Sequence, residues 1–173
     1  MKKILYYNTY MLSIKDSFFL LSFIFFCIFI IAKIYTEYRV KSDKKESKKN
    51  LIKNYIGLTL LIFGLLKLYN LDKFVTIFSK YDLISKNINL YGYLYPFIEI
   101  ILGICLLNSV NILDNLRLTI ILMIISILSV MVSILNGEKL RCGCLGSFFH
   151  IPLSYTTLAE NTMMLLMSYN YLK

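Results

Sequence analysis

The chain has 173 residues, of which 58% are hydrophobic and 15% aromatic, and its mean hydropathy is +0.66. A soluble domain of this size cannot bury so much apolar surface, so the composition excludes an ordinary globular protein and predicts a membrane protein that is partnered by lipid. The formal net charge of +9 does not indicate nucleic-acid binding, because most of the excess lies in one connection between hydrophobic segments. The length suits one domain without a separate soluble catalytic module.

Five apolar runs, each about long enough to cross a membrane, follow one another along the chain. They cover residues 18–34, 55–71, 90–110, 116–135 and 154–172. The fifth is the most polar, because Glu160 and Asn161 lie within it. No small-residue cleavage site follows the first run, so we expect an uncleaved N-terminal membrane anchor rather than a secretory signal.

Basic residues crowd the connection between the first two runs. Residues 41–50 are polar and charged without apolar periodicity, which predicts a solvated linker. Basic connections stay in the cytoplasm, so five spans would place the connections at 72–89 and 136–152 outside. The expected division is an N-terminal transmembrane anchor at 1–40, a basic cytoplasmic linker at 41–53 and a four-helix membrane domain at 54–173.

Four polar side chains lie inside the predicted spans: Lys67, Glu99, Glu160 and Asn161. At about 1.5 Å of rise per residue, they lie roughly 6 to 13 Å below the outer ends of their helices, in one layer. Isolated charges at such depth are costly, so we expect Lys67 to pair with Glu99 or Glu160 inside the bundle. The alternative is that Lys67 extends to the interface and Glu160 is protonated.

The connection at 136–152 contains two of the four cysteines, Cys142 and Cys144, with Gly143 between them. A bridge between cysteines so close would need the sharp turn that glycine permits, and it would be strained. Strained disulfides are labile and oxidising, and a ring this small removes little chain entropy, so the spacing favours a redox pair over a structural bridge. Cys142 and Cys144 are therefore candidate catalytic residues, with His150 as a candidate for proton transfer.

Two other interpretations of these cysteines stay open. One is a soft-metal site for copper(I) or zinc with His150 as a third ligand, and the other is a pair of incidental surface cysteines. Cys27 and Cys105 lie within apolar runs, where we expect small, inert packing residues.

Four groups of short motifs occur in an order and spacing that resemble a known family. They are Gly57-Leu58 with Gly64-Leu65-Leu66-Lys67, Tyr81-Asp82-Leu83-Ile84, Pro96-Phe97-Ile98-Glu99 with Gly103, and Cys142-Gly143-Cys144-Leu145-Gly146 followed by Ile151-Pro152-Leu153-Ser154. Over residues 54–172 the chain resembles the MauE (methylamine-utilisation) family within the DoxX-like group of four-helix membrane proteins. Two positions depart from the family pattern: Leu145 replaces an expected Phe, and Glu160 stands where a basic residue often precedes Asn161.

The resemblance implies an all-α membrane protein, a four-helix bundle to which residues 18–34 add one N-terminal transmembrane helix. It implies a place in the bacterial cytoplasmic (inner) membrane and a role in thiol-disulfide redox maturation of an exported protein. A thioredoxin-like or disulfide-containing extracytoplasmic protein would be the partner. Methylamine metabolism is not implied. Whether the chain is itself a thiol-disulfide oxidoreductase, and whether a quinone is its acceptor, stays open, and the alternatives are a non-catalytic assembly factor and a small transporter.

Overall fold

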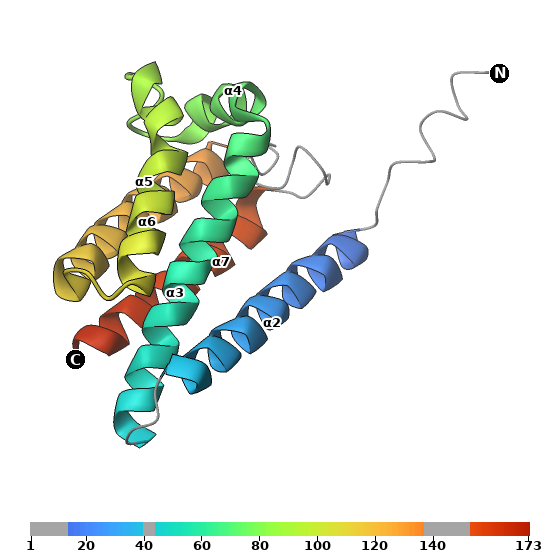
Figure 1. Cartoon of the computed structure of the whole chain (residues 1–173). Coiled ribbons are helices and arrows are strands. Elements are labelled where there is room, and N and C mark those ends of the chain that lie inside the picture. The colour runs from blue at the N-terminus through green and yellow to red at the C-terminus, as the bar shows by residue number, and fades with distance from the viewer. Residues whose placement is uncertain (1–13, 40–43, 137–152) are drawn as a thin grey trace.

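A computed structural model describes residues 14–39, 44–136 and 153–173, with side chains described for 24–38, 48–136 and 157–173. This part of the chain forms six α-helices and no strand, which confirms the all-α prediction (Figure 1). The helices are α2 (Ile14–Arg39), α3 (Lys44–Tyr69), α4 (Leu71–Tyr81), α5 (Asn89–Leu107), α6 (Ile112–Leu135) and α7 (Leu153–Leu172).

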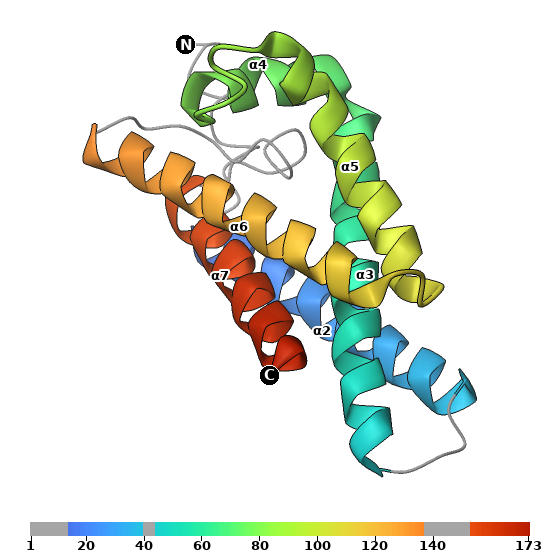
Figure 2. The ribbon, with the colours of Figure 1, turned by 90° about the vertical axis from the view of Figure 1, so that its left-hand side faces the viewer.

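Two helix pairs form the body of the molecule. Helix α3 packs along α5, and α6 packs along α7, while contacts of α3 with α7 and of α5 with α6 join the pairs. The second pair is inclined to the first (Figure 2). Helix α2 lies against α3. The four-helix arrangement implied by the resemblance, with α2 as an added helix, stays a prediction.

Three helices in the described part of the chain are long and apolar enough to cross a membrane. They are Lys48–Tyr69 within α3, the whole of α5 and the whole of α6, with 22, 19 and 24 residues. They match the second, third and fourth predicted spans. Helices α2 and α7 coincide with the first and fifth, but their side chains are only partly described, so their membrane crossing stays a prediction.

The α3–α5 interface is close because glycines face it from both sides. A Cβ on Gly103 would lie 2.7 Å from the carbonyl oxygen of Gly57 and 2.9 Å from the backbone nitrogen of Leu61. A Cβ on Gly64 would lie 2.7 Å from the side chain of Ile100. The two backbones can therefore approach only where side chains are absent, as is common between membrane helices.

Two segments that the sequence predicts as a linker and a connection contain helix in the structure. The expected linker at 41–53 is helical from Lys44, because its lysines and Glu46 favour helix and continue directly into the apolar part of α3. The expected connection at 72–89 contains α4, which begins after Asn70, whose side chain accepts a hydrogen bond from the backbone of Lys73. Helix α4 is amphipathic and too short to cross a membrane, so a search for long apolar runs does not detect it.

A polar link fastens α2 to α3. The side-chain nitrogen of Asn54 donates a hydrogen bond of 2.9 Å to the hydroxyl of Thr36, and that hydroxyl donates one of 2.7 Å to the carbonyl of Ala32. All three residues are buried. Within an apolar surrounding, such a bond fixes how the two helices face each other.

Candidate functional site

Helix α4 lies across the end of the molecule where α3 ends and α5 begins (Figure 1). Its buried face consists of Phe74, Val75, Phe78 and Tyr81, at the helical spacing of one side. Phe78 packs against Tyr95 of α5 with ring centroids 4.8 Å apart. The aromatic side chains of this short helix therefore cover the end of the α3–α5 pair.

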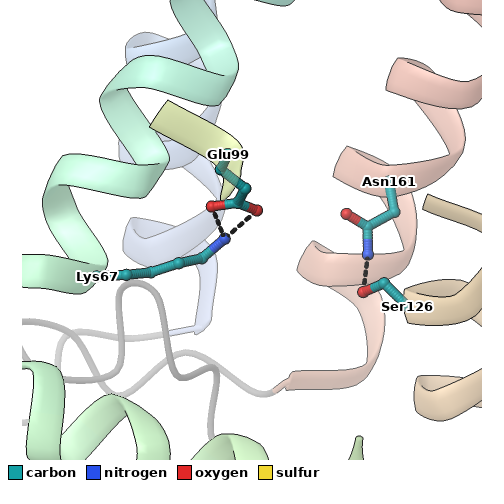
Figure 3. A network of polar contacts seen from close by, with 4 residues as sticks. All are labelled: Lys67, Glu99, Ser126 and Asn161. Atoms are coloured by element: carbon teal, nitrogen blue, oxygen red, sulfur yellow. Dashed lines mark hydrogen bonds and ion pairs between the residues drawn. The ribbon is translucent and has the colours of Figure 1, made fainter. Parts of the chain in front are cut away.

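Beneath these rings, Lys67 of α3 and Glu99 of α5 form a buried ion pair. The ammonium of Lys67 donates to both carboxylate oxygens of Glu99 at 2.5 Å (Figure 3). The two residues are 4% and 3% exposed. The same ammonium lies 4.8 Å from the ring centroid of Tyr95 and 5.8 Å from that of Phe74, within the range of cation–π attraction. Charge, hydrogen bonds and aromatic faces thus compensate for removing the lysine from water.

A second polar contact joins α6 to α7 across from the ion pair. The side-chain nitrogen of Asn161 donates a hydrogen bond of 2.7 Å to the hydroxyl of Ser126, and both residues are buried (Figure 3). Together with the ion pair, this contact gives each of the helices α3, α5, α6 and α7 a buried polar group in this part of the molecule.

A cavity of about 10 Å³ separates the two contacts. Its lining consists of Lys67, Ser126, Thr157, Glu160 and Asn161, together with the aromatic residues Phe74, Phe78, Tyr81 and Tyr95. Such a volume is about that needed by one water molecule, and the polar lining supplies the partners that a buried water requires.

Asp82 organises the chain between α4 and α5. Its Oδ1 accepts hydrogen bonds from the backbone nitrogens of Ile84 at 3.1 Å and Ser85 at 2.7 Å. The hydroxyl of Ser129 in α6 donates a hydrogen bond of 3.3 Å to Oδ2 of Asp82, and it accepts one from the backbone nitrogen of Leu83. Burial raises the pKa of the Asp82 carboxyl, although the three hydrogen bonds oppose the shift. Through these hydrogen bonds, the Asp82 carboxyl connects the turn that follows α4 to helix α6.

Residues 49–172 match the model of the family described as methylamine utilisation protein MauE. The chain belongs to the MauE family. This confirms the resemblance seen in the motifs, and the family with its apolar helices makes the chain an integral, multi-pass membrane protein. Comparison with curated proteins and with solved structures gives no significant match.

The four polar residues singled out within the spans all lie in the MauE region, and they meet. Lys67 pairs with Glu99, the first of the two expected partners, and Glu160 and Asn161 line the cavity beside Lys67. That they form a functional site stays a prediction. Cys142, Cys144 and His150 lie outside the described residues, so the redox and metal interpretations of that segment are unchanged.

Sequence reasoning missed Ser126, Asp82 and the aromatic lining as parts of this site. The signal for the aromatic lining was present in the spacing of Phe74, Phe78 and Tyr81, which places them on one side of a helix. For Asp82, the sequence offers only its place in the motif Tyr81-Asp82-Leu83-Ile84. Ser126 carries no signal, because a serine within an apolar helix commonly bonds to its own backbone.

Proposed function

We propose that this MauE-family protein supports thiol-disulfide redox maturation of an exported protein, with Cys142 and Cys144 as its redox pair. The observation that carries the proposal is the Cys-Gly-Cys sequence in the segment that joins α6 to α7. The lysine-rich beginning of α3 supports a cytoplasmic position for the opposite end of the molecule, so this segment would lie outside the cytoplasmic membrane.

The exchange proceeds through two sulfur displacements. A thiolate of the exported partner attacks the Cys142–Cys144 disulfide, forming a mixed disulfide and releasing one cysteine as thiolate. The partner's second thiolate then displaces the bound cysteine, so the partner gains a disulfide and the pair is left reduced. A quinone-class acceptor in the membrane would take the two electrons and two protons when the pair is oxidised again.

Charge near the cysteines favours this chemistry. Arg141 and Lys139 are close in sequence and stabilise a thiolate, and Cys142, directly beside Arg141, is the residue expected to exchange with the partner. His150 is the candidate for moving the proton.

Trapping of the partner tests the proposal. In cells that carry Cys142→Ser or Cys144→Ser, the remaining cysteine should accumulate as a mixed disulfide with an exported protein, identified by mass spectrometry after non-reducing electrophoresis. Cys27→Ser and Cys105→Ser are the matched controls, and both should leave the partner's disulfides unchanged. If the double Cys142→Ser, Cys144→Ser variant supports normal partner oxidation, the redox role fails and the non-catalytic assembly role replaces it.

A further inference from the structure

The beginning of α3 lies at the level of lipid head groups. Its first turns project beyond α7 and beyond the turn between α5 and α6 (Figure 1, Figure 2). The apolar run of this helix begins at Tyr55, so Lys48 and Lys49 lie roughly 9 to 11 Å before it along the helix axis. The head-group region is about 5 to 8 Å deep on each side of a bilayer, so these lysines lie at its outer margin, and their long side chains can reach the phosphates.

Two lysines of this part of α3 contact the ends of other helices. Lys53 is 4% exposed and donates a hydrogen bond of 2.5 Å to the hydroxyl of Ser109, in the turn between α5 and α6. One turn earlier on the same side of α3, Nζ of Lys49 lies 5.7 Å from the ring centroid of Tyr171, within the range of cation–π attraction. Because Tyr171 lies in the last turn of α7, Lys49 marks the place where α3 and α7 meet at this end.

The positive charge of Lys48 and Lys49 is open to the surroundings. Both side chains are exposed, and they add to a stretch in which six lysines lie between positions 41 and 53. Two described carboxylates at this end pair within their own helices, in Lys33–Glu37 of α2 and Asp114–Arg117 of α6. An anion supplied by the membrane would therefore complement Lys48 and Lys49 directly.

We infer that Lys48, Lys49 and Tyr171 form a surface that binds the head group of an anionic phospholipid, with its phosphate beside the two ammonium groups. Basic residues next to a membrane span are attracted to anionic lipid, and each contributes about fivefold in affinity. Bound there, the phosphate also offsets the repulsion between Lys49 and Lys53, which share one side of the helix at a spacing of four. The inference depends neither on the cysteine pair nor on which side of the membrane this end faces.

Lipid is favoured over other anions by the place of the surface. Inorganic phosphate and nucleic acid also bind lysines, but neither is held at the level where α3 enters the hydrocarbon. The phosphates of the bilayer lie there permanently, within the distance over which salt leaves charges unscreened. The experiment therefore compares these three sources of negative charge.

Native mass spectrometry of the full-length protein, released from detergent micelles, measures the binding. The wild type should bind dioleoyl phosphatidylglycerol more tightly than zwitterionic dioleoyl phosphatidylcholine. Lys48→Gln and Lys49→Gln should each weaken phosphatidylglycerol binding by about fivefold and the double variant by about 25-fold, with phosphatidylcholine binding unchanged. Glutamine keeps the helix tendency of lysine, and both positions are exposed, so the fold should be retained.

Two further variants separate a local surface from the overall charge of the protein. Lys48→Arg with Lys49→Arg keeps both cations and should retain phosphatidylglycerol binding. Lys80→Gln with Lys86→Gln removes two exposed lysines at the opposite end of the molecule, and it should weaken binding far less than the matched pair in α3. Equal weakening by the two glutamine pairs, or loss of binding in the arginine pair, would overturn the inference.

Hydrogen exchange shows where the lipid is bound. Phosphatidylglycerol should slow exchange in the last turn of α7 in the wild type and have no such effect in Lys49→Gln, because Lys49 is the residue that reaches Tyr171. Equal affinity of the wild type for the two lipids would overturn the inference. So would displacement of the bound lipid by millimolar inorganic phosphate, which would indicate a site for the free anion, or by a short oligonucleotide, which would indicate a nucleic-acid surface.

Discussion

Several interactions at this end of the molecule converge on Lys67. It holds Glu99 at 2.5 Å, lies over two aromatic rings and lines the cavity next to Glu160. A buried ion pair is seldom more stabilising than a well-packed apolar pair, but losing one partner leaves a buried charge without its counter-ion. The cost of a substitution here therefore depends on which partner remains.

Lys67→Met should lower the free energy of unfolding by about 3 kcal/mol, because Glu99 loses the cation that balances it. The double variant Lys67→Met, Glu99→Leu should recover most of that loss, since two apolar side chains can replace the pair. Unfolding in mixed detergent micelles, followed by circular dichroism, measures both. Lys33→Met, at an exposed ion pair of α2, is the matched control and should have little effect. A double variant as unstable as the single one would contradict this explanation.

Asp82 should contribute to stability by accepting hydrogen bonds from the backbone of the turn between α4 and α5. Asp82→Ala leaves the partly buried backbone nitrogen of Ile84 and the buried one of Ser85 without their acceptor and should cost about 1 to 3 kcal/mol. Asp82→Asn retains an acceptor oxygen and should cost less. Chemical unfolding of the two variants under one condition measures the difference, and equal losses would show that the carboxylate itself is required.

The same residue predicts a pH dependence. Burial raises the pKa of Asp82 above 3.8, so the folded protein holds this proton more tightly than the unfolded chain. Its contribution to stability is complete below pH 3.8 and is lost as the pH rises through the folded value. Compared with Asp82→Asn, the wild type should therefore lose stability as the pH rises from 3.8. Unfolding midpoints of both proteins, measured as the pH rises from 3.8, test the direction of this change. A wild type that gains stability relative to Asp82→Asn as the pH rises would contradict the prediction.

At the scale of the elements, the interface between α3 and α5 depends on the absence of side chains. Gly57 and Gly103 oppose each other there, and a Cβ on Gly103 would meet backbone atoms at 2.7 and 2.9 Å. Backbone cannot move aside as a side chain can, so the helices would have to separate. Because Lys67 and Glu99 lie on these same two helices, separation would also lengthen their ion pair.

Gly103→Ala should therefore destabilise the protein by about 1 to 3 kcal/mol, as expected for overpacking. Gly57→Ala on the opposite side of the same interface is the matched comparison, because the nearest atoms to its Cβ would lie at 3.1 Å and need to move by only a few tenths of an ångström, so it should cost less. Thermal unfolding in one detergent compares the two variants. Equal loss from both would show that the closer backbone contact at Gly103 is not what limits the approach of α3 to α5.

The elements also show what the sequence could predict and why it missed the rest. Long apolar runs located α3, α5 and α6, because crossing a membrane sets both their length and their composition. Helix α4 was not predicted, because it is apolar on one face only and is too short to cross a membrane. Its pattern of Phe74, Phe78 and Tyr81 spans only two turns. The pairing of Lys67 with Glu99 could be predicted, because an isolated charge within a membrane is costly. The contact of Asn161 with Ser126 could not, because it depends on how α6 and α7 face each other.

For the whole molecule, the orientation in the membrane is the prediction that bears most on function. The lysine-rich beginning of α3 should lie in the cytoplasm, and the segment between α6 and α7 should lie outside. Intact cells treated with a membrane-impermeant thiol reagent should therefore label Cys142 and Cys144 after mild reduction, and should leave an introduced Ser47→Cys unlabelled until the cells are opened. Labelling of Ser47→Cys together with protection of Cys142 in intact cells would reverse the orientation.

The link between Asn54 and Thr36 bears on how the protein can be shortened. The family match begins at residue 49, which invites a truncated chain without α2. Such a chain would lose the Thr36 hydroxyl that accepts the hydrogen bond from the side chain of Asn54. It would also lose the surface of α2 that helps to keep Asn54 only 2% exposed. In the truncated protein a bare amide would face lipid or recruit a second copy, so the family boundary is an unsafe place to cut.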